Sequence, residues 1–116
     1  MMQQYTFQDL IEITRRVIRA FEAAEQRPWP IEATLIELMK QTGDLARRVM
    51  TAEHYYLPDR EQDPAYQTTT EEIGDELADV LYCVIRVAEH YHIDLEQAHL
   101  RARRSELRYL GQDASF

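Results

Sequence analysis

Four acidic residues recur at three- and four-residue steps in the segment 69–91, namely Glu72, Asp75, Glu76 and Asp79. If this segment is a helix, their side chains lie on neighbouring turns of one face, with Cβ atoms roughly 5–6 Å apart. Carboxylates placed in this way repel one another, at a cost of roughly 0.2–0.5 kcal/mol per pair, unless a cation or solvent relieves the repulsion. The row is therefore a candidate cation site.

A solvated acidic face is the alternative interpretation of the same row. Asp and Glu are favoured in the first turn of a helix, where the macrodipole is positive, and this accounts for Glu71 and Glu72. Thr69 with Glu72 three residues later also predicts a capping box at the start of the helix. Asp75, Glu76 and Asp79 lie deeper and carry the functional hypothesis.

A second polar pair, Gln41 and Asp44, has the same i, i+3 spacing as Glu76 and Asp79. If the two helices that carry these pairs pack antiparallel, both pairs face one space. Mg²⁺ takes about six oxygen ligands and keeps several waters, so two or three carboxylates plus substrate phosphates are sufficient to hold it. The two pairs together predict a magnesium site.

Amphipathic helices must position these residues. Apolar side chains at three- and four-residue steps predict helices over about 5–26, 31–50, 69–91 and 95–109, with Asp94 as the N-cap of the last. Gly43 in the second helix predicts a close approach of another helix or a ligand. In the segment 69–91 we expect the apolar stripe to enter the core, and it consists of Ile73, Leu77, Val80, Leu81, Val84, Val87, Ala88 and Tyr91.

Composition favours one all-α domain spanning 1–116, because the chain has only 3 Gly and 4 Pro and long stretches of helical periodicity. Its 21 acidic against 13 basic residues give a net charge of −8, which disfavours nucleic acid and anionic membranes as partners. We expect a cytoplasmic protein, since the single Cys83 cannot form an internal disulfide and neither a membrane span nor a signal peptide is visible.

Two segments lack helical periodicity. The polar connection 51–68 is longer than compact domains normally use, which is typical of either a lid or a disordered segment, and the pattern leaves both open. Residues 110–116 follow the last helix, and we expect them to be a frayed tail.

The sequence Gln41-Thr42-Gly43-Asp44-Leu45-Ala46, followed by Glu76-Leu77-Ala78-Asp79-Val80-Leu81-Tyr82, resembles the MazG-like all-α NTP pyrophosphohydrolases. Those proteins are marked by E-x-x-E on one helix and E-x-x-D on the next, which hold Mg²⁺. The resemblance covers roughly 29–109 and is strongest over 71–98. It implies a helical bundle completed by dimerisation, as a homodimer or a higher homo-oligomer.

The resemblance also implies an activity, namely house-cleaning hydrolysis of a nucleoside triphosphate to a monophosphate and pyrophosphate. Catalytic residues would then be Gln41, Asp44, Glu76 and Asp79. Mg²⁺, or Mn²⁺ in its place, would be held by Asp44, Glu76 and Asp79, while Glu72 or Asp75 would hold a second cation or act as a base. The substrate would be contacted by Lys40, Arg101, Arg104, Tyr109 and Trp29.

Two positions depart from the family pattern, because Gln41 and Asp44 stand where the family has two Glu residues. The first pair has lost one charge and one methylene of reach, which predicts weaker magnesium binding. Glu37, one turn earlier, either restores a carboxylate or is solvated. Trp29 either stacks on a nucleobase or packs against its own turn. A non-catalytic helical module that binds another molecule, or binds nucleotide weakly, is therefore the alternative function.

Overall fold

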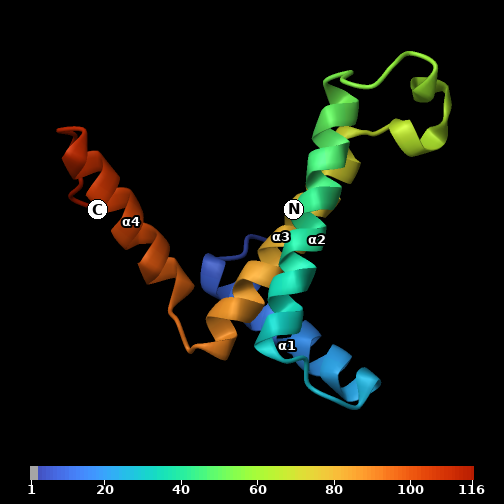
Figure 1. Cartoon of the computed structure of the whole chain (residues 1–116). Helices are drawn as coiled ribbons and strands as arrows, with labels where there is room; N and C mark the ends of the chain where they lie inside the picture. The colour runs from blue at the N-terminus through green and yellow to red at the C-terminus, as the bar shows by residue number, and fades with distance from the viewer. Residues whose placement is uncertain (1–2) are drawn as a thin grey trace. The chain divides into compact units, whose positions relative to one another are not determined.

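The computed structural model describes residues 3–116, and these form four α-helices, two short 3₁₀ turns and no strand (Figure 1). The α-helices are α1 (Phe7–Glu25), α2 (Ile31–Ala52), α3 (Thr70–His90) and α4 (Leu95–Tyr109). The all-α prediction is confirmed, and each helix end lies within two residues of the expected position. Over the described range, no helix is both long enough and apolar enough to cross a membrane.

Local side-chain capping explains where α1, α3 and α4 begin. Thr69 Oγ1 accepts a hydrogen bond from the Glu72 backbone N–H at 3.1 Å, and Asp94 Oδ1 accepts one from the Gln97 N–H at 3.1 Å, as the sequence predicts. Helix α1 begins with a capping box between Thr6 and Asp9. These side chains satisfy backbone donors that have no partner inside the helix, so each start is fixed by residues within one turn of it.

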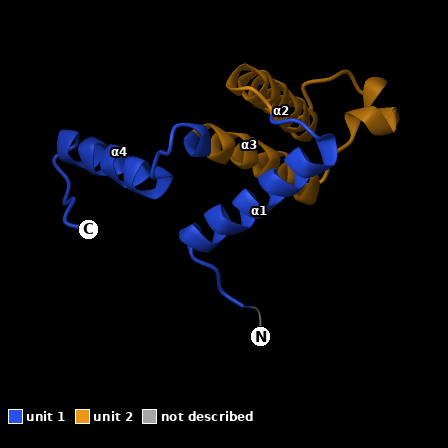
Figure 2. Ribbon diagram, turned by 90° about the horizontal axis from the view of Figure 1, so that it is seen from below, with its two compact units in different colours: residues 1–28, 88–116 blue, residues 29–87 orange. Residues whose placement is uncertain are grey.

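The chain divides into two compact units, and the boundary falls within α3 (Figure 2). The first unit consists of residues 1–28 and 88–116, and it contains α1 and α4. Ile11 of α1 and Ala88 are its buried apolar residues. Arg15 Nε donates to Glu89 Oε2 at 2.6 Å, so an ion pair ties α1 to the last residues of α3, which belong to the same unit.

The second unit, residues 29–87, contains α2 and most of α3. Arg48 near the end of α2 pairs with Glu72 near the start of α3, and the charges of Glu37 and Lys40, early in α2, act on Cys83, late in α3. The two helices are therefore antiparallel neighbours, as the magnesium hypothesis requires. Cys83 and Ile85 are almost completely buried.

The connection between α2 and α3 is folded rather than extended. It contains η1 (Arg60–Gln62) and η2 (Pro64–Tyr66), and the rings of Tyr56 and Tyr66 meet edge to face with centroids 4.9 Å apart. Gln67 Nε2 donates to the Glu61 carbonyl at 3.0 Å. The segment is thus held by its own contacts, which the weak periodicity of its sequence did not indicate.

The predicted burial of the α3 stripe is wrong for part of its length. Leu77, Leu81 and Tyr91 are exposed at 53%, 40% and 58%, whereas Cys83 and Ile85, which are not in the stripe, are buried. The reason is the rotation of α3. Glu76 and Cys83 are seven residues apart and therefore share a face, and that face is turned toward α2.

Gly43 does not mark a close approach within this chain. A Cβ atom built at Gly43 would meet no heavy atom within 4 Å, and the same holds at Gly74. The prediction of a close approach at Gly43 is therefore wrong for the described chain.

Candidate functional site

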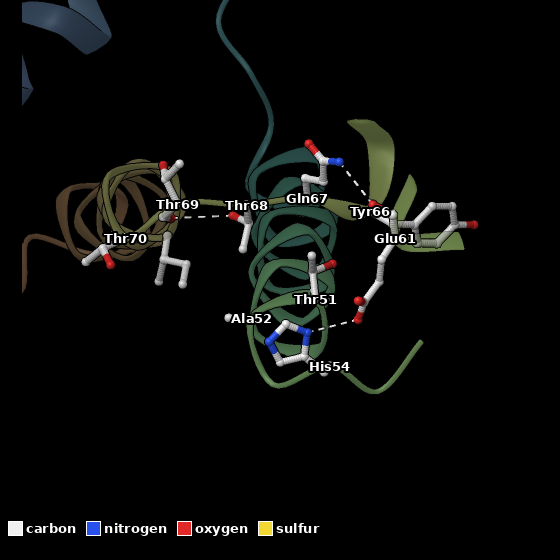
Figure 3. A pocket seen from close by; sticks show the side chains of 10 residues that line it. Thr51, Ala52, His54, Glu61, Tyr66, Gln67, Thr68, Thr69 and Thr70 are labelled. Carbon is white, nitrogen blue, oxygen red and sulfur yellow. Dashed lines mark hydrogen bonds and ion pairs between the residues drawn. The ribbon is translucent and has the colours of Figure 1, made fainter. Parts of the chain in front are cut away.

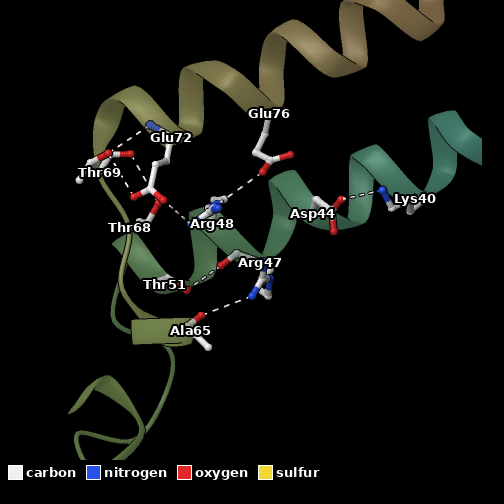
Figure 4. Close-up of polar contacts among 10 residues, drawn as sticks. All are labelled: Lys40, Asp44, Arg47, Arg48, Thr51, Ala65, Thr68, Thr69, Glu72 and Glu76. Carbon is white, nitrogen blue, oxygen red and sulfur yellow. Dashed lines mark hydrogen bonds and ion pairs between the residues drawn. The ribbon is translucent and has the colours of Figure 1, made fainter. Parts of the chain in front are cut away.

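Arg48 lies between the acidic side chains of α3 (Figure 4). Its Nη1 is 3.0 Å from Glu72 Oε2, and its Nε is 3.5 Å from Glu76 Oε1. The Glu76 side chain is only 14% exposed and that of Arg48 22%, so this pair is better shielded from solvent than an ordinary surface ion pair. Two of the four acids in the row thus already have a cation, which α2 supplies.

The polar residues of α2 also have partners, because they form ion pairs and a hydrogen bond with one another. Lys40 Nζ lies 3.7 Å from Asp44 Oδ2 and 3.8 Å from Glu37 Oε1. Gln41 Nε2 donates to Glu37 Oε1 at 2.9 Å, and Figure 4 shows Lys40 directed toward Asp44. Lys40 therefore pairs with a predicted metal ligand, and Glu37 accepts one hydrogen bond, from Gln41, rather than standing alone in solvent.

Asp79 completes the set of predicted metal ligands. It is exposed, and among the residues that the structure describes it makes no hydrogen bond or ion pair. Asp79 lies three residues after Glu76, on the stretch of α3 between the Arg48 contact and Cys83. Asp44 and Gln41 occupy the corresponding stretch of α2, between Arg48 and Glu37. The antiparallel pairing therefore brings the two predicted pairs to the same level of the two helices.

The donor chemistry of these residues fits Mg²⁺, but their present arrangement is not a preformed cage. Carboxylate and amide oxygens are the ligands that Mg²⁺ prefers. Within residues 3–116, however, no three His, Cys, Asp or Glu side chains converge closely enough to hold a metal ion. Two of the proposed ligands, Glu76 and Asp44, are instead in ion pairs with Arg48 and Lys40.

The predicted nucleobase contact, Trp29, has an internal neighbour. The guanidinium carbon of Arg86 lies 5.6 Å from the centre of the Trp29 ring and 5.9 Å from that of Tyr82. A guanidinium at these distances is attracted to both ring faces. This geometry favours packing at the start of α2 over stacking on a base.

Three of the predicted substrate contacts lie on α4, in the first unit. Arg101 is exposed, and Tyr109 is 90% exposed. Arg104 Nε donates to the Phe116 carbonyl at 2.6 Å, and its guanidinium lies 5.1 Å from the centre of the Phe116 ring. The segment 110–116, which we expected to be frayed, is thus folded back against α4 through Arg104.

A cavity of about 420 Å³ lies beside the start of α3 in the second unit (Figure 3). Its wall contains the hydroxyl groups of Thr51, Thr68, Thr69 and Thr70 and the ion pair of His54 Nδ1 with Glu61 Oε1, which are 2.9 Å apart. Thr51 Oγ1 already donates to the Arg47 carbonyl at 2.8 Å. Nothing in the sequence pattern predicted this cavity, because it is formed by the folded connection.

Cys83 is the buried thiol of the second unit, with 1% of its surface exposed. Burial raises the pKa of the Cys83 thiol above its ordinary value, and the negative charge of Glu37 raises it further. The thiol is therefore neutral at physiological pH, and a neutral buried thiol is a poor nucleophile and a poor metal ligand. The interpretation of Cys83 as a packing residue fits this environment.

Arg48 is a residue of this site to which the sequence analysis gave no role. It follows Glu37, Gln41 and Asp44 at four-residue and three-residue steps, so the spacing places it on the same face of α2. That spacing was the available signal, since a cation on the face of one helix that meets an acidic row on another is expected to form ion pairs.

A comparison of the chain with protein-family models, curated proteins and solved structures found no match.

Proposed function

We propose that this chain is a magnesium-dependent nucleoside triphosphate pyrophosphohydrolase, which converts a nucleoside triphosphate and water to a monophosphate and pyrophosphate. The observation that carries the proposal is the antiparallel pairing of α2 and α3. It brings the Gln41/Asp44 pair and the Glu76/Asp79 pair to the same level, as the resemblance to MazG-like enzymes requires.

Each residue has a role in this proposal. Asp44, Glu76 and Asp79 would hold Mg²⁺, with Mn²⁺ as a substitute, and Gln41 would supply an amide oxygen or orient a water molecule. The metal, when bound, neutralises phosphate charge and makes a bound water more acidic. Glu72 or Asp75 would hold a second cation or act as a base. Arg101 and Arg104 offer guanidinium groups suited to the outer phosphates.

The proposal includes assembly with a second copy of the chain, as a homodimer or a higher homo-oligomer. Only four apolar side chains of the described residues are buried, whereas a domain of this length normally buries roughly 65% of its unfolded surface. Exposed apolar residues remain on α1, α2 and α3, including Phe21, Met39 and Leu77. A second copy that offers the same faces would cover them.

The alternative is a non-catalytic helical module that keeps this fold without hydrolysing nucleotides. The ion pairs of Arg48 with Glu76 and of Lys40 with Asp44 favour it, because they neutralise two proposed ligands without any metal. In that case the acidic row serves the α2–α3 contact alone.

The test is a screen of the common ribo- and deoxyribonucleoside triphosphates with Mg²⁺ or Mn²⁺, with released pyrophosphate as the readout. The proposal expects pyrophosphate from at least one nucleotide, and loss of that release in the Asp79→Asn variant. Glu71→Gln is the matched control, because Glu71 is an exposed acid on the same helix outside the proposed ligand set. Absence of pyrophosphate with every nucleotide would favour the non-catalytic module.

A further inference from the structure

The segment 110–116 turns back on α4 through a defined backbone motif. Gly111 has a left-handed backbone with a φ of 71°, and its N–H donates to the Arg108 carbonyl at 3.0 Å. The Gln112 N–H donates to the Leu107 carbonyl at 2.8 Å. These two hydrogen bonds form a Schellman motif, which commonly ends a helix at a glycine. The residues that follow therefore run back beside α4 rather than away from it (Figure 1).

Phe116 contacts the guanidinium group of Arg104 in two ways. Arg104 Nε donates to the Phe116 carbonyl oxygen at 2.6 Å, and the guanidinium carbon lies 5.1 Å from the centre of the Phe116 ring. Arg104 is half-buried, whereas Arg101 and Arg108, three residues before it and four residues after it, are exposed. Residues at these spacings share one face of a helix. Phe116 thus covers the middle one of three guanidinium groups on this face of α4.

The contact with Phe116 occupies the same Arg104 groups that would bind a phosphate. A carbonyl oxygen is uncharged, so it is a weaker acceptor for a guanidinium than a phosphate oxygen, which forms charge-assisted and often bidentate hydrogen bonds. Among the residues that the structure describes, the side chains of Arg101 and Arg108 make no hydrogen bond or ion pair. A phosphate chain that displaces Phe116 therefore finds two further guanidinium groups within about 10 Å along the helix.

We propose that residues 112–116 act as a latch on α4: Phe116 holds Arg104 in the closed state, and a phosphate chain binds this guanidinium only after the latch has moved away. The latch rests on the proposed function, which assigns the outer phosphates of the substrate to Arg101 and Arg104. It lowers the apparent affinity for phosphate by the fraction of chains in which it is open. A triphosphate, which can contact several guanidinium groups, should open the latch at a lower concentration than orthophosphate does.

The experiment titrates the full chain with inorganic triphosphate in a chelator, and it follows binding by calorimetry and by the NMR signals of the Phe116 ring. Phe116→Ala should tighten triphosphate binding about two- to fivefold, which corresponds to the loss of one exposed cation–π contact. Leu110→Ala should leave binding unchanged. It is the matched control, because Leu110 is 65% exposed in the same segment and its side chain offers no ring to a guanidinium. In the Arg104→Gln background, Phe116→Ala should have no effect.

Four results would overturn the latch: unchanged or weaker triphosphate binding in Phe116→Ala, equal tightening in Leu110→Ala, an effect of Phe116→Ala that persists without Arg104, or no triphosphate binding to any variant. Phe116→Leu is a second variant, because it keeps the apolar bulk and removes the ring, so tighter binding is expected there too. The proposed function fails separately, through the absence of pyrophosphate release from nucleotides. Release at equal rates from wild type and Phe116→Ala, with equal triphosphate affinities, would support the function and remove the latch.

Discussion

At the scale of single residues, the acidic row of α3 is a set of paired groups as much as a set of candidate ligands. Glu72 and Glu76 share Arg48, and Asp44 pairs with Lys40, whereas Asp75 and Asp79 stand without an ion pair in the described chain. Like charges at these spacings repel, and cations on the facing helix remove that repulsion. The acids therefore help to join α2 to α3 whether or not a metal binds.

The thiol of Cys83 gives a prediction at this scale. Its pKa is raised in the folded chain, chiefly by burial, from an ordinary value of 9.0. Below pH 9 the thiol is protonated in both states, and its contribution to stability is fully present. As the pH rises above 9 the unfolded chain loses this proton first, so stability falls, by at most about 1.4 kcal/mol per pH unit.

The measurement compares the free energy of unfolding of wild type and Cys83→Ser at pH 8 and pH 10. Wild type should lose more stability than the variant between these values, since all other titrating groups are common to both. Equal losses, or fast reaction of Cys83 with a thiol reagent in the native protein at pH 8, would contradict the burial of this side chain.

At the scale of elements, the helix boundaries could be predicted because they depend on local chemistry. Thr69, Asp94 and the prolines at 28 and 30 act on backbone groups within one turn, and the sequence displays them directly. The face that each helix turns inward could not be predicted so well. It depends on the neighbouring helix, and α3 turns Glu76 and Cys83, rather than Leu77 and Leu81, toward α2.

In the candidate site, too, some features could be predicted from the sequence and others depend on how the helices pack. The spacing of Gln41/Asp44 and Glu76/Asp79 could be anticipated from periodicity, whereas the antiparallel pairing entered only as the condition for both pairs to face one space. The spacing also places Arg48 on the face of α2 that carries Gln41 and Asp44, but which acids it pairs with depends on how α3 is rotated against α2. The cavity beside Thr69 depends on the fold of a connection whose sequence shows no period.

Gly43 supplies a prediction for α2. Glycine in a helix interior costs about 1 kcal/mol relative to alanine, and a Cβ at this position meets open space. Gly43→Ala should therefore raise the free energy of unfolding by about 1 kcal/mol, as measured by urea denaturation. Gly74→Ala in α3 is the comparison, because its surroundings are equally open. Destabilisation by Gly43→Ala alone would reveal a close approach by a second copy or a ligand.

At the scale of the whole molecule, the composition of the exposed surface is the dominant feature. The chain carries a net charge of −8, yet large apolar side chains are exposed on each of α1, α2 and α3. Exposed apolar faces of this kind mark surfaces that another protein covers. The charge favours divalent cations over nucleic acid as ligands.

Assembly can be tested through the exposed leucines. Light scattering of wild type should give twice the chain mass of 13.8 kDa, and Leu77→Lys should give the chain mass itself, because a buried ammonium would oppose association. Leu57→Lys is the control, since Leu57 is 70% exposed in the connection rather than on a helical face. A wild-type monomer at micromolar concentration would remove the assembly proposal.

The most direct test of the account is the effect of Gln41→Glu and of Asp79→Asn on pyrophosphate release at a fixed Mg²⁺ concentration. A carboxylate at position 41 adds a full charge where the amide offers a dipole, so an enzyme with a weakened ligand set should release pyrophosphate faster and saturate at lower Mg²⁺. A Gln41 suited to one substrate would instead give altered selectivity or lower activity. In both cases Asp79→Asn should abolish release. The proposed function is contradicted if neither wild type nor Gln41→Glu releases pyrophosphate from any nucleotide, while Asp79→Asn changes stability alone.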